Sequence, residues 1–117
     1  MVQKDIVIVG LNHRSAPIEV RESVAFESDY LRDALSRLHN YPSIDEGVIL
    51  STCNRVEVVA AASDSATAYQ DIGSFLAEQK SQYNGLALDD HTYRYRGADA
   101  VRHLFRVAAS LDSMVVG

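Results

Sequence analysis

Residues 47–59 read Gly-Val-Ile-Leu-Ser-Thr-Cys-Asn-Arg-Val-Glu-Val-Val, and the rest of the chain is arranged around them. Two runs rich in β-branched residues flank a short polar junction, 52–55, which predicts two strands joined by a tight turn. The junction holds Cys53, the only cysteine of the chain, and Arg55 follows two residues later. A thiol can act as a nucleophile, and a guanidinium binds carboxylates through a planar fork. The stretch therefore predicts a reactive thiol close to a carboxylate-binding group.

Length and composition predict a single globular domain over residues 1–117. Hydrophobic residues make up 47% and charged residues 23%, as in ordinary folded proteins. The net charge of −5 argues against a general nucleic-acid coat but allows a local basic patch. No apolar run is long enough to cross a bilayer, so we expect no membrane association. A single cysteine cannot form an internal disulfide, so a reducing cytoplasm is the expected location.

The residues before the junction predict a strand and two helices. Residues 5–11 form a nearly continuous β-branched run, which is typical of a central strand. A polar loop over 12–17 precedes a short helix over 18–26. Ser28 is the expected N-cap of a second helix, whose apolar residues recur at helical spacing as far as Leu38.

Two helices and a strand are predicted after the junction. Helical spacing of apolar residues predicts a helix over 64–83, and alternating aromatic and polar residues predict a strand over 91–96. A last helix follows Gly97, and its pattern breaks at 111–113. This order is typical of an α+β fold, a ferredoxin-like βαββαβ antiparallel sheet with helices on one face. The last helix is an addition at the C-terminus of that arrangement.

Each candidate side chain also has a less specific interpretation. Cys53 could be a small buried hydrophobic residue at a strand end. Arg55 could pair with Glu57 across a solvent-exposed face, where such a pair contributes little. His103 could be a partly buried histidine of the last helix. The four histidines and the cysteine show no short ligand spacing, so we expect no metal site.

A second group of residues combines aromatic and basic side chains. Residues 93–96 read Tyr-Arg-Tyr-Arg, and Arg102 and Arg106 follow in the last helix. Such a group could contact a nucleic-acid backbone and stack on bases, or it could be an ordinary solvated strand face beside a helix. The region around Gly10 has one glycine where a dinucleotide-binding loop needs three, so no cofactor site is expected in this chain.

Several segments together resemble the glutamyl-tRNA reductases of tetrapyrrole biosynthesis. The resemblance covers nearly the whole chain and is most specific at the Thr-Cys-Asn-Arg junction. The matching segments are 10–17 (Gly-Leu-Asn-His-Arg-Ser-Ala-Pro), 21–22 (Arg-Glu), 25–26 (Ala-Phe), 50–57 (Leu-Ser-Thr-Cys-Asn-Arg-Val-Glu), 103–108 (His-Leu-Phe-Arg-Val-Ala) and 111–113 (Leu-Asp-Ser).

This resemblance implies a mechanism and a set of site residues. The family's N-terminal catalytic domain binds glutamyl-tRNA, and the cysteine matching Cys53 forms a thioester with the glutamyl group. NADPH then reduces the thioester to glutamate-1-semialdehyde. The resemblance further implies that His103 assists proton transfer or orients the substrate and that Arg55 clamps the substrate's side-chain carboxylate. Thr52, Asn54 and Ser113 would help to hold the substrate by hydrogen bonds.

The resemblance also carries expectations about the longer proteins of the family. This chain resembles their catalytic domain alone, without the NADPH-binding and dimerisation domains, so we expect acylation of Cys53 but no complete reduction. A homodimer formed through the C-terminal domain is implied for the full-length enzyme. The aminomutase that consumes glutamate-semialdehyde is an implied partner.

Two other functions are compatible with the residues alone. The first is a non-catalytic ferredoxin-like module that binds RNA or a small ligand. The second is a redox-sensing thiol domain, against which the lack of a second, resolving cysteine argues. Thiol reactivity discriminates the enzyme from the binding module, because only the enzyme needs an accessible thiolate.

Overall fold

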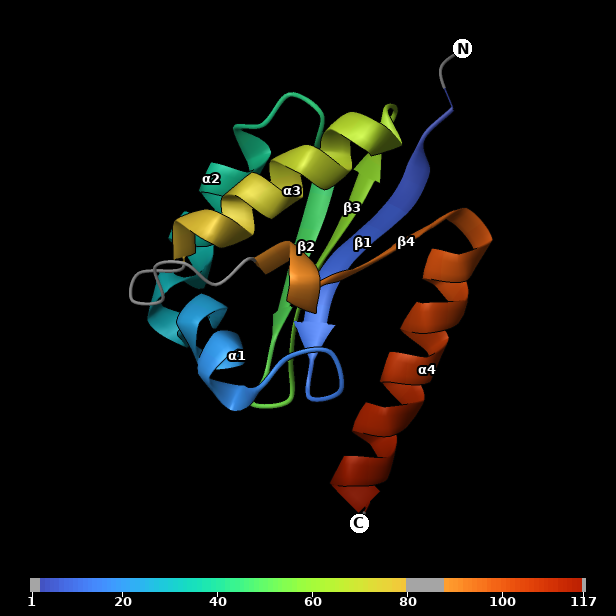
Figure 1. Ribbon diagram of the computed structural model, residues 1–117. Coiled ribbons are helices and arrows are strands. Elements are labelled where there is room, and N and C mark those ends of the chain that lie inside the picture. The colour runs from blue at the N-terminus through green and yellow to red at the C-terminus, as the bar shows by residue number, and fades with distance from the viewer. Residues whose placement is uncertain (1–2, 80–87, 117) are drawn as a thin grey trace.

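The computed structural model describes residues 3–79 and 88–116, with side chains described as far as residue 110. Within these residues, four strands and four α-helices follow one another (Figure 1). In order they are β1 (Asp5–Asn12), α1 (Ile18–Val24), α2 (Leu31–His39), β2 (Glu46–Ser51), β3 (Arg55–Ala62), α3 (Ser65–Gln79), β4 (Tyr93–Arg96) and α4 (Gly97–Val116). Two 3₁₀ turns, Ser28–Tyr30 and Leu88–His91, precede α2 and β4.

The strands form one antiparallel sheet in the order β2-β3-β1-β4. β1 and β3 are the central strands, and β1 pairs with β3 from Asp5 opposite Ala62 to Asn12 opposite Arg55. This topology confirms the predicted ferredoxin-like arrangement. It also explains the β-branched run of β1, because a central strand covered on both faces needs apolar side chains on both sides.

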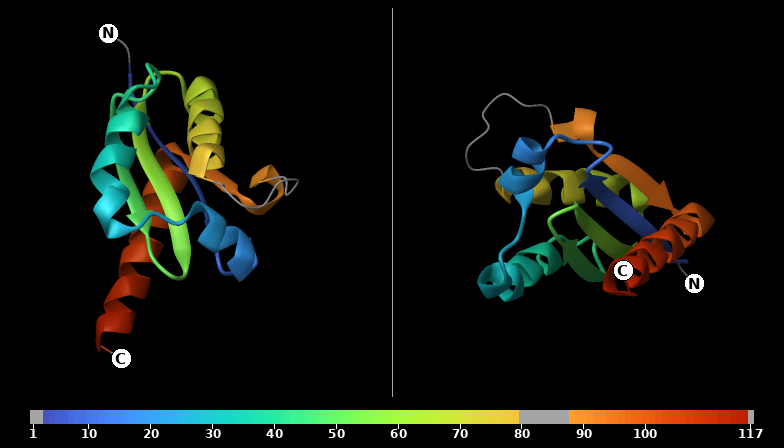
Figure 2. Two further views of the ribbon diagram at one scale, coloured as in Figure 1. Left: turned by 90° about the vertical axis from the view of Figure 1, so that its left-hand side faces the viewer. Right: turned by 90° about the horizontal axis from the view of Figure 1, so that it is seen from below.

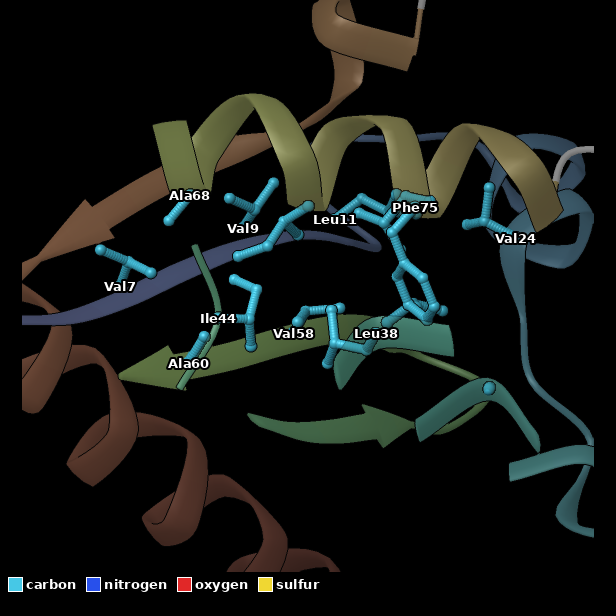
Figure 3. Packing of buried hydrophobic residues seen from close by; sticks show 14 of the residues in the cluster. Val7, Val9, Leu11, Val24, Leu38, Ile44, Val58, Ala60, Ala68 and Phe75 are labelled. Carbon is cyan, nitrogen blue, oxygen red and sulfur yellow. The ribbon is translucent and has the colours of Figure 1, made fainter. Parts of the chain in front are cut away.

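The hydrophobic core lies between the sheet and the helices α1, α2 and α3 (Figure 3). Successive strand residues point to opposite faces, so alternate residues of each central strand enter this core. β1 contributes Val7, Val9 and Leu11, and α3 contributes a set that includes Phe75, whose ring stacks on Phe26 at a centroid distance of 5.6 Å. All five side chains are buried.

The helix α4 covers the other face of the sheet (Figure 2). Its buried residues Ala100, His103 and Val107 recur at helical spacing and face β1 and β4. Ile8, which is fully buried, lies under this helix and alternates with the core residues of β1. Within the described residues, no helix is both long and apolar enough to pass through a membrane.

Some boundary predictions differ from the structure, and one of them is tested only in part. Ser28 is not an N-cap, because it begins a 3₁₀ turn and no side chain caps either that turn or α2. The backbone of α4 continues through residues 111–113, since Asp and Ser disfavour a helix only mildly and no proline or glycine ends it there. The predicted helix over 64–83 is α3 as far as Gln79, and its remainder lies outside the described residues.

Candidate functional site

The Thr52–Arg55 junction is a tight turn that exposes Cys53. The backbone N–H of Thr52 donates to the carbonyl of Arg55 at 2.8 Å. The Thr52 hydroxyl oxygen accepts hydrogen bonds from the backbone N–H groups of Asn54 and Arg55, both at 3.2 Å. A threonine side chain thus replaces backbone acceptors at the turn. The thiol of Cys53 is free and exposed, which excludes the interpretation of a buried small hydrophobic residue.

Arg55 begins β3 and turns its guanidinium toward the α4 face of the sheet. Its Nη1 lies 3.1 Å from Oε1 of Glu57, and its side chain is 12% exposed. The predicted alternative of an Arg55–Glu57 pair on a solvent-exposed face is therefore wrong in one respect. The pair exists, but Glu57 is only 2% exposed because α4 covers this part of the sheet.

Glu57 contacts a second predicted site residue, His103 of α4. The Nε2 atom of the His103 ring contacts Oε2 of Glu57, and both residues are buried. With the Glu57 carboxylate as the acceptor, Nε2 of His103 is the donor of this hydrogen bond. One carboxylate therefore connects the arginine of the junction to the histidine of the last helix.

Gly10 of β1 provides the space for Glu57. It pairs with Glu57 on one side and with Tyr93 of β4 on the other. A Cβ atom at Gly10 would lie 2.7 Å from Cγ of Glu57 and 2.8 Å from the carbonyl oxygen of Val56. A glycine in a central strand often marks such a close approach.

Two tyrosines of β4 surround the His103 ring. The ring of Tyr95 stacks on it at a centroid distance of 4.6 Å, and that of Tyr93 lies 5.3 Å away. The Tyr93 hydroxyl oxygen is buried and makes no hydrogen bond of normal geometry within the described residues. Burial above all, and then the nearby Glu57 carboxylate, raises the pKa of Tyr93 far above its ordinary value. Tyr93 is therefore a protonated hydrogen-bond donor throughout the physiological range.

The loop after β1 is shaped by its own side chains. Oδ1 of Asn12 accepts hydrogen bonds from the backbone N–H groups of Arg14 at 2.9 Å and Ser15 at 3.1 Å. Such a turn is typical of asparagine. A ring nitrogen of His91 lies 3.2 Å from the Ser15 carbonyl, which joins this loop to the segment before β4.

These elements surround a cavity of about 640 Å³ at one end of the sheet. Of its lining residues within the described part of the chain, three are arginines and none is a carboxylate, so the cavity suits an anionic ligand. The lining residues are Asn12, His13, Arg14, Ser15, Arg55, Tyr93, Tyr95, His103, Arg106, Val107, Ala109 and Ser110.

The structure brings some predicted site residues together and leaves others apart. Arg55 and His103 line the cavity, whereas Thr52, Cys53 and Asn54 lie in the adjoining turn. Cys53 precedes Arg55 by two residues, so their Cα atoms lie at most about 7 Å apart. The side chain of Ser113 lies outside the described residues, although its backbone belongs to α4.

The predicted aromatic and basic surface is divided between the two faces of the sheet. Tyr93 and Tyr95 pack against His103 under α4, so they are not free to stack on bases. Arg94 and Arg96 alternate with them and are exposed on the other side. Arg94 lies over the ring of Tyr69 in α3, at 5.5 Å from its centroid. Arg94 and Arg96 therefore do not share a surface with the two tyrosines, whereas Arg106 of the same group lines the cavity with them.

The sequence pointed to Glu57 as a partner of Arg55 and to Tyr93 and Arg106 as part of an aromatic and basic group, but it did not place them, or His13 and Arg14, in one site. A signal for Glu57 was present. Gly10 interrupts an otherwise apolar strand, and a glycine there indicates that another group approaches the backbone closely. Nothing in the sequence alone indicated which group that would be.

The fold and site define a ferredoxin-like α+β domain with an exposed thiol next to a cationic cavity. The sequence profile of the family described as "Glutamyl-tRNAGlu reductase, N-terminal domain" matches residues 9–117. The chain therefore belongs to this family of glutamyl-tRNA reductase N-terminal domains.

Individual relatives agree with this assignment. The chain is 52% identical over 115 residues to the glutamyl-tRNA reductase of Carboxydothermus hydrogenoformans, covering 96% of this chain and 25% of the relative. It is 47% identical over 113 residues to the glutamyl-tRNA reductase of Trichlorobacter lovleyi, covering 97% and 26%. The solved glutamyl-tRNA reductase from Methanopyrus kandleri superimposes with a TM-score of 0.59 at 34% identity, covering 97% of this chain and 24% of that one. The chain thus spans about a quarter of the length of these relatives.

Proposed function

We propose that this chain is the part of a glutamyl-tRNA reductase that binds glutamyl-tRNA and accepts its glutamyl group on Cys53. The observation that carries the proposal is the exposed thiol in the Thr-Cys-Asn-Arg turn, next to a cavity with an arginine at its wall. Family membership supports the substrate, and the positions of Arg55 and His103 in the cavity wall support the roles proposed for these two residues.

The proposed reaction is an acyl transfer from oxygen to sulfur. The sulfur of Cys53 attacks the carbonyl carbon of the ester that joins glutamate to the terminal ribose of the tRNA. The carbon–sulfur bond forms, the carbon–oxygen bond to the ribose breaks, and the ribose oxygen takes the proton that the thiol gives up. The resulting thioester is a better electrophile than the ester, so covalent capture divides one difficult step into two easier ones.

The cavity next to Cys53 suits the side chain of the glutamyl group. Arg55 lines it, and a planar guanidinium can bind the side-chain carboxylate through two parallel hydrogen bonds. Glutamine, with a neutral amide, cannot form the same charged pair, so Arg55 supplies discrimination between the two amino acids. His103, with one ring nitrogen held by Glu57, is the residue that we assign to proton transfer or substrate orientation.

Reduction of the thioester by NADPH, which the family resemblance implies, is part of the proposed function of the longer enzyme. The described residues do not fit a dinucleotide. Gly10, the glycine nearest to the first loop, lies within β1, and the space a Cβ would take there is filled by Glu57 and not open to a phosphate. Helix α1, which follows that loop, is only seven residues long and begins after Pro17. We therefore place the NADPH site of the longer enzyme outside these residues.

The test is release of tRNA from glutamyl-tRNA labelled in its amino acid. We expect the chain to release tRNA and to carry label transiently on Cys53, after which water hydrolyses the thioester. Cys53→Ser should reduce release by at least about a hundredfold, because an unactivated hydroxyl is a poor nucleophile. Alanyl-tRNA is the matched control and should not react. Equal rates for the wild-type chain and Cys53→Ser would refute the proposal.

A further inference from the structure

Glu57 has an unusual position for a charged residue. It is the third residue of β3, a central strand, and is 2% exposed. Burying a carboxylate is costly unless both of its oxygens find partners. Here Oε1 pairs with Nη1 of Arg55, and Oε2 pairs with Nε2 of His103. A single buried side chain therefore contacts two of the residues that the proposed function uses.

Glu57 does not line the cavity, whereas Arg55 and His103 do. It can therefore act on a ligand only through these two partners. The guanidinium is planar, so holding Nη1 fixes the plane in which its remaining N–H groups point. Holding Nε2 of His103 likewise fixes the ring orientation and the nitrogen that carries the proton. The ring of Tyr95 stacks on one face of the same imidazole and limits the movement of the ring on that side.

The surrounding structure makes this carboxylate rigid. β3 is hydrogen-bonded to a strand on each side, and the Gly10 backbone lies against the Glu57 side chain. Side chains held in this way are suited to keeping functional groups near their productive geometry. Glu57 is buried on the α4 face beside Arg55 and His103, and a positioning role explains this location.

We propose that Glu57 is a positioning residue that orients Arg55 and His103 together toward the cavity. The proposal rests on the function proposed above. Glu57 fixes the arginine for carboxylate recognition and the histidine for proton transfer, so the two groups act as a unit. Loss of Glu57 should therefore weaken discrimination between glutamate and glutamine as well as the rate.

The first measurement compares Glu57→Gln with the wild-type chain, with Glu46→Gln as the matched control because Glu46 is exposed at the start of β2. Glutamine keeps the side-chain shape and removes the charge. We expect Glu57→Gln to slow tRNA release about tenfold and to lower the preference for glutamyl-tRNA over glutaminyl-tRNA by a similar factor. Glu46→Gln should leave both unchanged. An unchanged rate and preference in Glu57→Gln would overturn the proposal.

The second measurement separates positioning from a purely structural role. In a chain that carries both Arg55→Lys and His103→Gln, adding Glu57→Gln should change the rate less than about twofold, since groups that act through one another are not additive. An equal loss in both backgrounds would mean that Glu57 serves only the fold. Should Glu57→Gln not fold, Glu57→Asp replaces it, because it keeps the charge but shortens the side chain by one methylene group.

The third measurement does not depend on activity. The nitrogen NMR signals of the His103 ring and the Arg55 guanidinium should both shift in Glu57→Gln and neither should shift in Glu46→Gln. If the wild-type chain and Cys53→Ser release tRNA equally, the proposed function fails, and these signals alone then decide whether Glu57 orients the pair. Signals that stay in place would overturn the positioning role.

Discussion

The two faces of the sheet differ in what they bury, although the same strands supply both. The face toward α1, α2 and α3 holds a continuous apolar cluster. The face toward α4 holds Glu57 and His103, the two polar residues that are buried in the described part of the chain. Because a strand alternates its side chains, neighbours in sequence serve different purposes: Val56 and Val58 belong to the core, and Glu57 between them belongs to the site. Stability and chemistry can therefore be altered separately on one strand.

The largest expected effect comes from breaking the apolar face. Phe75→Ala removes a fully buried ring that stacks on Phe26, and we expect a loss of ~3–5 kcal/mol in the free energy of unfolding. Urea unfolding measures this loss, and Val48→Ala, at a position that is 62% exposed, should cost less than ~0.5 kcal/mol. The fraction of Phe75→Ala that remains folded should release tRNA at the wild-type rate. A loss below about 1 kcal/mol would contradict the assignment of Phe75 to the core.

Gly10→Ala should break the α4 face. The new methyl group would overlap Cγ of Glu57 and the carbonyl oxygen of Val56, so we expect a loss of ~1–3 kcal/mol together with slower tRNA release. Gly73→Ala is the matched control, because a Cβ at this position in α3 meets no atom within 4 Å. It should stabilise the helix by ~0.5–1 kcal/mol and leave release unchanged. Wild-type stability and activity in Gly10→Ala would show that Glu57 has room to move.

Thr52→Ala tests the turn that presents the thiol. The variant loses the acceptor for two backbone N–H groups, and we expect a cost of ~0.5–1.5 kcal/mol in thermal or urea unfolding. Thr52→Ser keeps the hydroxyl and should lose less. If both variants were equally stable, the side-chain hydrogen bonds of the turn would contribute nothing measurable.

The smallest effect at neutral pH is expected for Tyr93→Phe, which removes a buried hydroxyl without a hydrogen-bond partner in the described structure. We expect a change within ~1 kcal/mol. The pH dependence is more informative. The pKa of Tyr93 is raised, so the folded chain keeps a proton that the unfolded chain releases above its ordinary pKa of 10.0. Stability should therefore be complete below pH 10 and decline above it.

Tyr93→Phe should make this decline shallower. Burial, and then the hydrogen bond to Glu78, raise the pKa of Tyr41 to about 12. Tyr41 therefore contributes to the decline that remains in Tyr93→Phe. Tyr30→Phe is the control, at a tyrosine that is 62% exposed, and should reproduce the wild-type curve. The test is the free energy of unfolding of each variant, measured between pH 8 and pH 11. Parallel pH dependences for Tyr93→Phe and the wild-type chain would contradict the burial of the Tyr93 hydroxyl.

Periodicity predicted most of the fold but not the environment of the site. The β-branched run of β1 and the alternation of aromatic and polar residues in β4 were sufficient to predict these two strands, because both patterns follow directly from strand geometry. One interpretation puts Glu57 on a solvent-exposed face, because alternation separates the two faces of a strand but does not tell which face a distant helix covers. Here α4 covers it, bringing His103 to a residue 46 positions earlier in the chain. Likewise, the Ser28 prediction relied on the preference of serine for helix N-caps. In the structure Ser28 begins a 3₁₀ turn instead.

Family resemblance and local chemistry predict only part of the site. Cys53 and Arg55 share one turn, so their proximity follows from the sequence. The contact of Arg55 and His103 with one carboxylate required the strand register and the placement of α4. No pattern in the sequence encodes that three-residue arrangement.

The corner at Gly97 has a consequence for the order in which the molecule folds. Its backbone has φ of +58°, which lets β4 pass directly into α4 without a loop. The contacts of Tyr93 and Tyr95 with His103 therefore join residues that are close in sequence, and contacts of this kind form quickly. Glu57 reaches His103 only after the central strands have paired over a long separation in sequence. We therefore expect the cavity to be completed after these strands have paired, so a partly folded chain would expose the Cys53 turn before Glu57 has brought Arg55 and His103 together.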